Sequence, residues 1–188
     1  MYKDIFSRLF SLVIKPAEAW DKLRRREEDE ETFLSRFVYP LIGLMALAAF
    51  VGVLFTRKEF DFQVALKSSI MILVSSFGGF FLGVYMMNEV WQSFFKQPKD
   101  TKLIRYFVGY SSSLMFLLNI LLALLPEFIF LRVFVLYTVY IIWEGAVSYM
   151  GIAEDQRFKF TAIASVLVLA TPMAIELFLR MLMPGLRY

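Results

Sequence analysis

Apolar residues gather into five long runs separated by short polar segments. Each run approaches the roughly 20 residues that an α-helix needs to cross about 30 Å of hydrocarbon. Inside a bilayer, backbone polar groups must find partners within their own segment, so runs of this length predict helices. The five predicted spans are residues 37–55, 69–88, 106–125, 128–150 and 160–183. We therefore predict an all-α integral membrane bundle over residues 37–188.

Residues 1–36 follow a different pattern. Apolar residues recur at helical spacing between positions 5 and 14, and the intervening polar positions are Lys3, Asp4, Ser7, Arg8 and Ser11. This amphipathic pattern predicts a helix lying in the membrane interface on the cytoplasmic side. Pro16 suits the first position of a second, short helix, which Trp20 and Leu23 would anchor.

The composition narrows the possible chemistry. Hydrophobic residues make up 59% of the 188 residues, above the roughly half that is usual in a soluble domain. Cysteine and histidine are both absent, which excludes thiol nucleophiles, imidazole bases and zinc or haem sites built from them. The net charge of +3 comes without a basic patch, so nucleic acid is not an expected partner. We expect no enzymatic activity, no cofactor and no metal.

The distribution of Lys and Arg predicts the orientation. With the N-terminus inside, most basic residues fall in cytoplasmic segments, whereas the outer loops hold Arg57, Lys58 and Lys67. By the positive-inside rule, this favours a cytoplasmic N-terminus and an outer C-terminus.

Ionisable side chains are costly at membrane depth and are therefore candidates for function. Glu144 shares one face of the fourth span with Tyr137 and Tyr140. Two interpretations remain open for this stripe. It is either a site for a headgroup, proton or solute, or a carboxyl group that helps hold the bundle together through hydrogen bonds to tyrosine hydroxyls.

A second polar group is predicted in the outer half of the bundle. Asn119, Arg132 and Glu176 fall at similar depth if each span rises 1.5 Å per residue, and Arg180 follows Glu176 by one turn. We predict that Arg132 and Glu176 neutralise one another. Pro172 removes a helical hydrogen bond and predicts a kink, which would serve either a transport pathway or helix packing.

Small residues mark the second span. Ser75, Gly79 and Gly83 follow one another at four-residue spacing. This spacing lets two helices approach closely, either within the bundle or between protomers.

Four stretches of the sequence carry a family resemblance. They are Ile14-Lys15-Pro16-Ala17-Glu18-Ala19-Trp20, Tyr39-Pro40-Leu41, Lys102-Leu103-Ile104-Arg105-Tyr106 through Gly109-Tyr110-Ser111, and Tyr137-Thr138-Val139-Tyr140-Ile141-Ile142-Trp143-Glu144-Gly145. In kind and order they resemble the Yip domain family, the Ypt/Rab-interacting membrane proteins, and in particular its short bacterial members. Many relatives carry a proline shortly after the Gly-Tyr-Ser, which this chain lacks.

The resemblance implies a five-span protein of the bacterial cytoplasmic membrane. It implies a role with Rab GTPases only for eukaryotic relatives. Two classes of function follow for this chain. One is a non-enzymatic, membrane-organising scaffold or partner-binding protein, with lipids, another protein or a second copy as partner. The alternative is a small transporter, channel or lipid-translocating protein that uses the buried polar groups.

Overall fold

Every element in the described part of the chain, residues 2–26, 28–56 and 59–182 of this computed structural model, is a helix. The N-terminal segment holds α1 (Tyr2–Ile14) and α2 (Pro16–Arg24). The spans are built from α3 (Glu30–Phe33), a π-helical turn η1 (Leu34–Val38), α4 (Tyr39–Thr56), α5 (Phe62–Ser93), α6 (Thr101–Ser111), α7 (Ser113–Leu124), the 3₁₀ helix η2 (Pro126–Leu136), α8 (Tyr137–Ser148) and α9 (Glu154–Leu182).

Five helical segments are long and apolar enough to cross a membrane, which confirms the predicted spans. They run over Glu30–Thr56, Phe62–Ser93, Thr101–Leu124, Pro126–Ser148 and Glu154–Leu182. All five begin before the predicted first residue, and the first two also end beyond the predicted last residue. Arg57, Lys58 and Met183, which the predictions used, lie outside the described residues.

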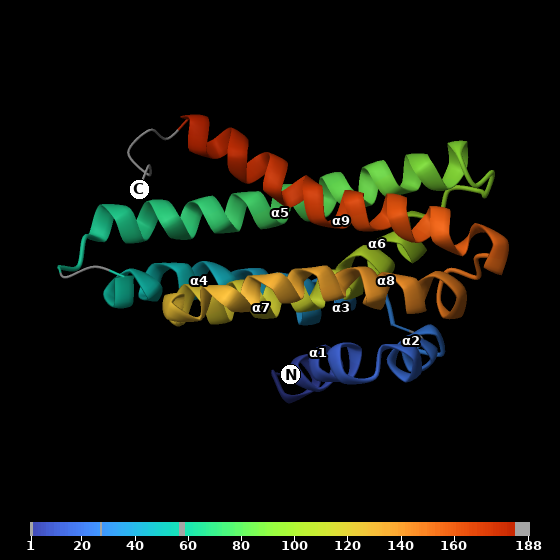
Figure 1. Cartoon of the computed structure of the whole chain (residues 1–188), viewed down its shortest axis with the longest axis horizontal. Helices are drawn as coiled ribbons and strands as arrows, with labels where there is room; N and C mark the ends of the chain where they lie inside the picture. The colour runs from blue at the N-terminus through green and yellow to red at the C-terminus, as the bar shows by residue number, and fades with distance from the viewer. Residues whose placement is uncertain (1, 27, 57–58, 183–188) are drawn as a thin grey trace.

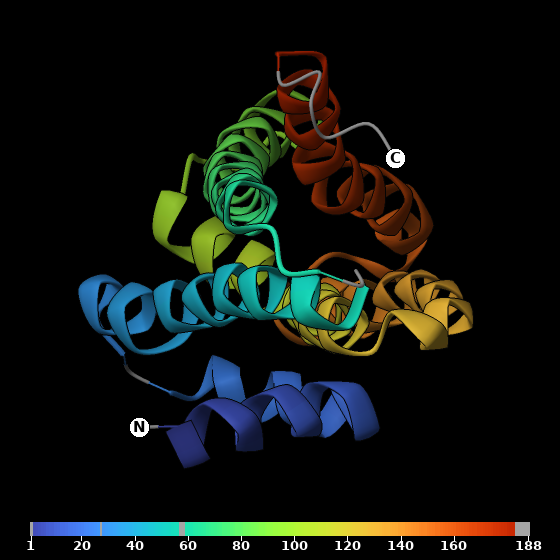
Figure 2. The same ribbon diagram turned by 90° about the vertical axis from the view of Figure 1, so that its left-hand side faces the viewer.

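The spans form two layers. Helices α5 and α9 lie side by side in one layer, and α4, α7 and α8 form the other (Figure 1). Contacts of α4 with α5 and of α8 with α9 join the layers. Helices α1 and α2 lie against the outside of the second layer, and α1 runs across the long axis of the bundle (Figure 2). This crosswise course suits a helix in the membrane interface.

The third and fourth spans are irregular. Helix α6 gives way to α7 at Ser112, whose ψ of −4° departs from the helical value, although no proline is present. The Ser112 and Ser113 hydroxyls donate to the carbonyls of Val108 and Tyr110 at 2.8 and 2.5 Å. Such bonds are known to bend helices. The fourth span begins as a 3₁₀ helix directly after the tight connection at Leu125.

We expect cysteine labelling to establish the orientation. The chain has no cysteine of its own, so single cysteines replacing Gln63, Leu186, Ser7, Gln97 and Gln156 can be tested without background. A membrane-impermeant maleimide added to intact cells should label only positions 63 and 186, because the basic residues hold the other three inside. Labelling at position 97 would contradict this topology. Leu186 lies outside the described residues.

Candidate functional site

A buried guanidinium holds the N-terminal helices on the bundle. The side chain of Arg8, on α1, is 6% exposed. Its Nη1 and Nη2 donate to Glu28 Oε2 and Oε1 at 2.9 and 3.1 Å, a bidentate pair. Its Nε and Nη2 donate to Asp4 Oδ2 at 3.1 and 2.6 Å. Nη1 also donates to the Tyr110 hydroxyl at 3.0 Å. These hydrogen bonds match the five N–H groups of the guanidinium.

The charges of this cluster stabilise one another. Burial lowers the pKa of the Arg8 guanidinium, but its hydrogen bonds to Glu28 and Asp4 outweigh burial and raise that pKa above its ordinary value. The hydrogen bond from Arg8 lowers the pKa of the Asp4 carboxyl. Tyr106 contributes from α6, since its hydroxyl donates to the backbone oxygen of Glu28 at 2.6 Å. The charged groups of the cluster therefore satisfy one another's hydrogen bonds and connect α1 to α6.

Trp20 anchors α2 beside this cluster. Its side chain is fully buried, and its Nε1 donates to the backbone oxygen of Ile141 on α8 at 2.8 Å. The indole lies 5.5 Å from the ring of Phe107 and 5.0 Å from that of Tyr149, measured between centroids. A Cβ added to Gly145 would lie 2.6 Å from the indole, so only glycine fits there. We call Asp4, Arg8, Trp20, Glu28 and Tyr110 the N-terminal joint.

Helix α1 has apolar side chains on two faces. Ile5, Leu9 and Leu12 are buried against the protein. Phe6, Phe10 and Ile14 follow one another at four-residue spacing and are 38%, 50% and 70% exposed. We call these three residues the α1 stripe. The joint leaves it uncovered.

A polar cleft of about 540 Å³ opens next to the joint. It lies between the α2–α3 connection and the start of α6. Arg24, Arg26 and Lys102 line it, as do the acidic residues Glu28, Asp29 and Asp100. Because both signs of charge are present in equal number, the cleft has no net charge with which to select a ligand.

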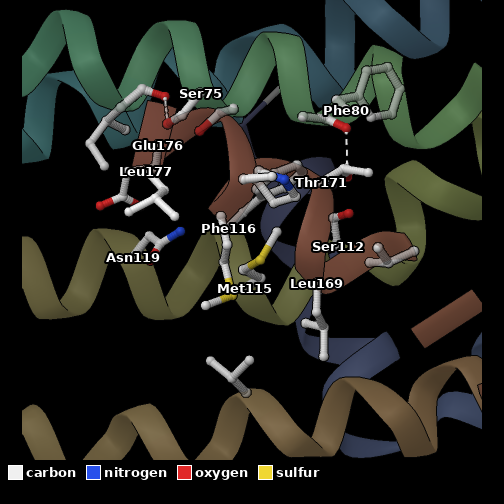
Figure 3. Close-up of a pocket in the computed structure, with 18 of the residues that line it drawn as sticks. Ser75, Phe80, Ser112, Met115, Phe116, Asn119, Leu169, Thr171, Glu176 and Leu177 are labelled. Carbon is white, nitrogen blue, oxygen red and sulfur yellow. Dashed lines mark hydrogen bonds between the residues drawn. The ribbon is translucent and has the colours of Figure 1, made fainter. Parts of the chain in front are cut away.

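A larger cavity, of about 640 Å³, lies between α5, α7, η2 and α9. Figure 3 shows Phe80, Met115, Phe116 and Leu169 around it, with Ser75, Asn119 and Glu176 among the polar residues. Leu136 of η2 and Met173 of α9 also line the cavity and are each 66% exposed. The cavity therefore reaches the surface between η2, in the fourth span, and α9, the fifth span. We call it the lateral cavity.

A model of the Yip1 domain family matches residues 10–175 of the chain. The chain belongs to the Yip1 domain family. No significant match was found among curated proteins or solved structures.

The residues that carry the Yip1-family resemblance meet at the N-terminal joint. Trp20 comes from the first stretch, Tyr110 from the third, and Ile141 and Gly145 from the fourth. Leu41, of the second stretch, is fully buried in the same core. Trp20 and Ile141 are 121 positions apart along the chain. The family signature in this chain therefore has a structural meaning, which is the attachment of the N-terminal helices to the spans.

In the structure Glu144 lies beside an arginine of α9 instead of accepting hydrogen bonds from the tyrosine hydroxyls of its own span. Glu144 Oε1 lies 3.6 Å from Nη2 of Arg157, on α9. The guanidinium carbon of Arg157 also lies 4.3 Å from the centroid of the Trp143 ring. Tyr137 and Tyr140 contact each other, with ring centroids 5.3 Å apart. Among the described residues, neither tyrosine hydroxyl bonds to Glu144.

The predicted pairing of Arg132 with Glu176 is wrong. Glu176 Oε1 instead accepts from Nη2 and Nε of Arg180 at 2.7 and 3.0 Å, one turn along α9. Arg132 is exposed and lines the lateral cavity. The prediction assumed a regular rise in the fourth span, but Arg132 lies in a 3₁₀ helix that bounds the cavity opposite α9. Asn119 lines the same cavity from α7.

The small residues of α5 do form a close helix contact. A Cβ on Gly79 would lie 2.5 Å from the Cα of Pro172, and one on Gly83 would lie 3.0 Å from Thr171 Oγ1. Ser75 is buried in the same row. Pro172 lies inside α9 without ending it. The predicted close approach is therefore between α5 and α9 within one chain.

Sequence reasoning missed the joint. Helical periodicity places Arg8 on the polar face of α1, and no local pattern distinguishes Glu28 or Tyr110. The one available signal was the family resemblance, since Trp20 and Tyr110 both lie in its motifs.

Proposed function

We propose that this protein is a non-enzymatic, membrane-organising scaffold of the cytoplasmic membrane. The observation that carries the proposal is a helix fixed to the bundle with an apolar edge left uncovered. A free amphipathic helix would bind and leave the membrane independently. Here the N-terminal joint holds α1 against the spans, so the α1 stripe stays in one place.

The arrangement of side chains around α1 supports an interfacial position. At 100° per residue, the stripe occupies one flank of the helix between the buried face and the polar positions Ser7 and Ser11, with Lys3 on the same flank as the stripe. The helix thus has one face for the protein, one for hydrocarbon and one for water. Apolar side chains inserted at the headgroup boundary expand one leaflet relative to the other, and binding of this kind is sensitive to curvature.

We expect the full chain to change the shape of vesicles through the α1 stripe. Reconstituted at increasing protein-to-lipid ratios, the wild-type protein should produce smaller or tubular vesicles, measured by electron cryomicroscopy. The double variant Phe6→Ser/Phe10→Ser should leave vesicles near their starting diameter, because each Phe side chain that enters the membrane contributes up to about 1.5–3 kcal/mol of transfer free energy.

The matched control is Phe158→Ser, which removes a phenylalanine that is 73% exposed but lies on α9, away from the stripe. It should reshape vesicles as the wild type does. The proposal fails if the wild type leaves vesicle diameter unchanged, or if the double variant reshapes vesicles as strongly as the control.

A further inference from the structure

The lateral cavity combines an apolar interior with unpaired polar groups. Phe80, Phe116 and Val108 belong to its lining and are buried. At its edge, Glu176 and Arg180 neutralise one another. That pairing leaves Arg132 as the remaining charge of the lining, and within the described part of the chain its guanidinium has no hydrogen-bond or ion-pair partner. The cavity therefore carries one uncompensated positive charge.

A second polar group in the cavity also lacks a partner. The hydroxyls of Ser75 and Ser112 donate to backbone oxygens three and four residues earlier, and that of Thr171 to the backbone oxygens of Leu167 and Gly79. The side-chain amide of Asn119 forms no hydrogen bond with any described residue, and Figure 3 shows it directed into the cavity. Amides and guanidinium groups at membrane depth are costly when unpaired. Asn119 and Arg132 thus present N–H donors from two elements to one space.

The position of the cavity restricts what can fill it. Its exposed lining residues Leu136 and Met173 belong to η2 and α9, which are parts of two segments long and apolar enough to span a membrane, so lipid has access to the cavity there. The volume of about 640 Å³ is within the roughly 300–1,000 Å³ of typical small-molecule sites. The interior suits a hydrocarbon chain, whereas the unpaired donors require acceptor oxygens and a negative charge.

We propose that the lateral cavity binds one anionic phospholipid. An acyl chain occupies the apolar interior among Phe80, Met115 and Phe116. The guanidinium of Arg132 binds the headgroup phosphate, and the amide of Asn119 donates to another oxygen of the same lipid. Guanidinium groups bind phosphate through strong, charge-assisted hydrogen bonds, which favours a lipid with net negative charge over a zwitterionic one.

Native mass spectrometry can test this site in the purified full chain. Delipidated protein in detergent is mixed with equal amounts of phosphatidylglycerol and phosphatidylcholine that carry identical acyl chains. We expect the wild type to retain one phosphatidylglycerol in preference to phosphatidylcholine. Arg132→Gln should lower phosphatidylglycerol retention about tenfold, since a hydrogen bond to a charged group is being lost. Phosphatidylcholine retention should fall less, because the choline ammonium already compensates the charge of its phosphate.

Two further variants separate the cavity from the protein surface. Met115→Trp places a larger side chain in the cavity and should abolish retention of both lipids; Leu169→Trp repeats the test from α9 if the first variant does not fold. Lys67→Gln removes an exposed charge on α5 that does not line the cavity and should behave as the wild type does. The proposal is overturned if Arg132→Gln keeps the wild-type preference, or if filling the cavity leaves phosphatidylglycerol bound.

Discussion

Replacing Arg8 with methionine should lower the free energy of unfolding by about 3–5 kcal/mol, the usual cost of removing one partner from a buried ion pair. The side chain of Glu28 is 6% exposed, so its carboxylate would remain buried without its bidentate partner. Thermal unfolding in detergent, followed by circular dichroism, would measure the loss. Adding Glu28→Gln to Arg8→Met should restore part of the stability, because no unpaired charge then remains.

Arg26→Met provides the matched control. Arg26 also carries a guanidinium beside Asp4 and Glu28, at 3.4 and 3.6 Å, but its side chain is 41% exposed. Exposed pairs of this kind contribute about 0–1 kcal/mol. Equal losses for Arg8→Met and Arg26→Met would show that the joint does not depend on the buried guanidinium.

Gly79→Leu should be among the most damaging changes within the spans. A Cβ at position 79 would lie 2.5–2.7 Å from the Cα, Cβ and nitrogen of Pro172, and backbone atoms cannot move aside as a flexible side chain can. Helices α5 and α9 would separate, which also breaks the hydrogen bond from the Thr171 hydroxyl to the Gly79 carbonyl at 2.9 Å. We expect a loss of about 3 kcal/mol or more, seen as reduced folded yield and a lower Tm.

Gly43→Leu is the control for this substitution, because nothing lies within 4 Å of a Cβ at Gly43. It makes the same exchange in another span and should leave the Tm nearly unchanged. Gly83→Leu should fall between the two, since its Cβ would meet the hydroxyl of Thr171 at 3.0 Å. If Gly79→Leu melts at the temperature of Gly43→Leu, the α5–α9 contact is not close.

The spans could be predicted because membrane insertion depends on local composition. About 20 apolar residues in succession suffice, and no distant contact is needed. The close helix contact through Ser75, Gly79 and Gly83 could also be predicted, because small residues at four-residue spacing fall on one helix face. The sequence did not identify Pro172 as the surface that this face meets, because that depends on how two distant helices pack.

The joint could not be read from the sequence for a related reason. Helical periodicity divides α1 into an apolar and a polar face, and Arg8 falls on the polar one. Its acceptors Glu28 and Tyr110 lie 20 and 102 positions away, and no local pattern connects them to it. Similarly, counting depth at 1.5 Å per residue failed for Arg132, because the first half of its span is a 3₁₀ helix, which rises about 2 Å per residue.

The binding site of Trp20 is completed late during synthesis of the chain. The carbonyl that its indole nitrogen binds belongs to Ile141, which is made 121 residues later. At about 5–20 residues per second, the ribosome needs about 6–24 s to reach that point. The segment that emerges first is therefore among the last to reach its final place, and the lipid surface is available to its apolar side chains until then. A nascent chain halted before α8 should leave Trp20 accessible to aqueous quenchers, whereas the finished protein buries it completely.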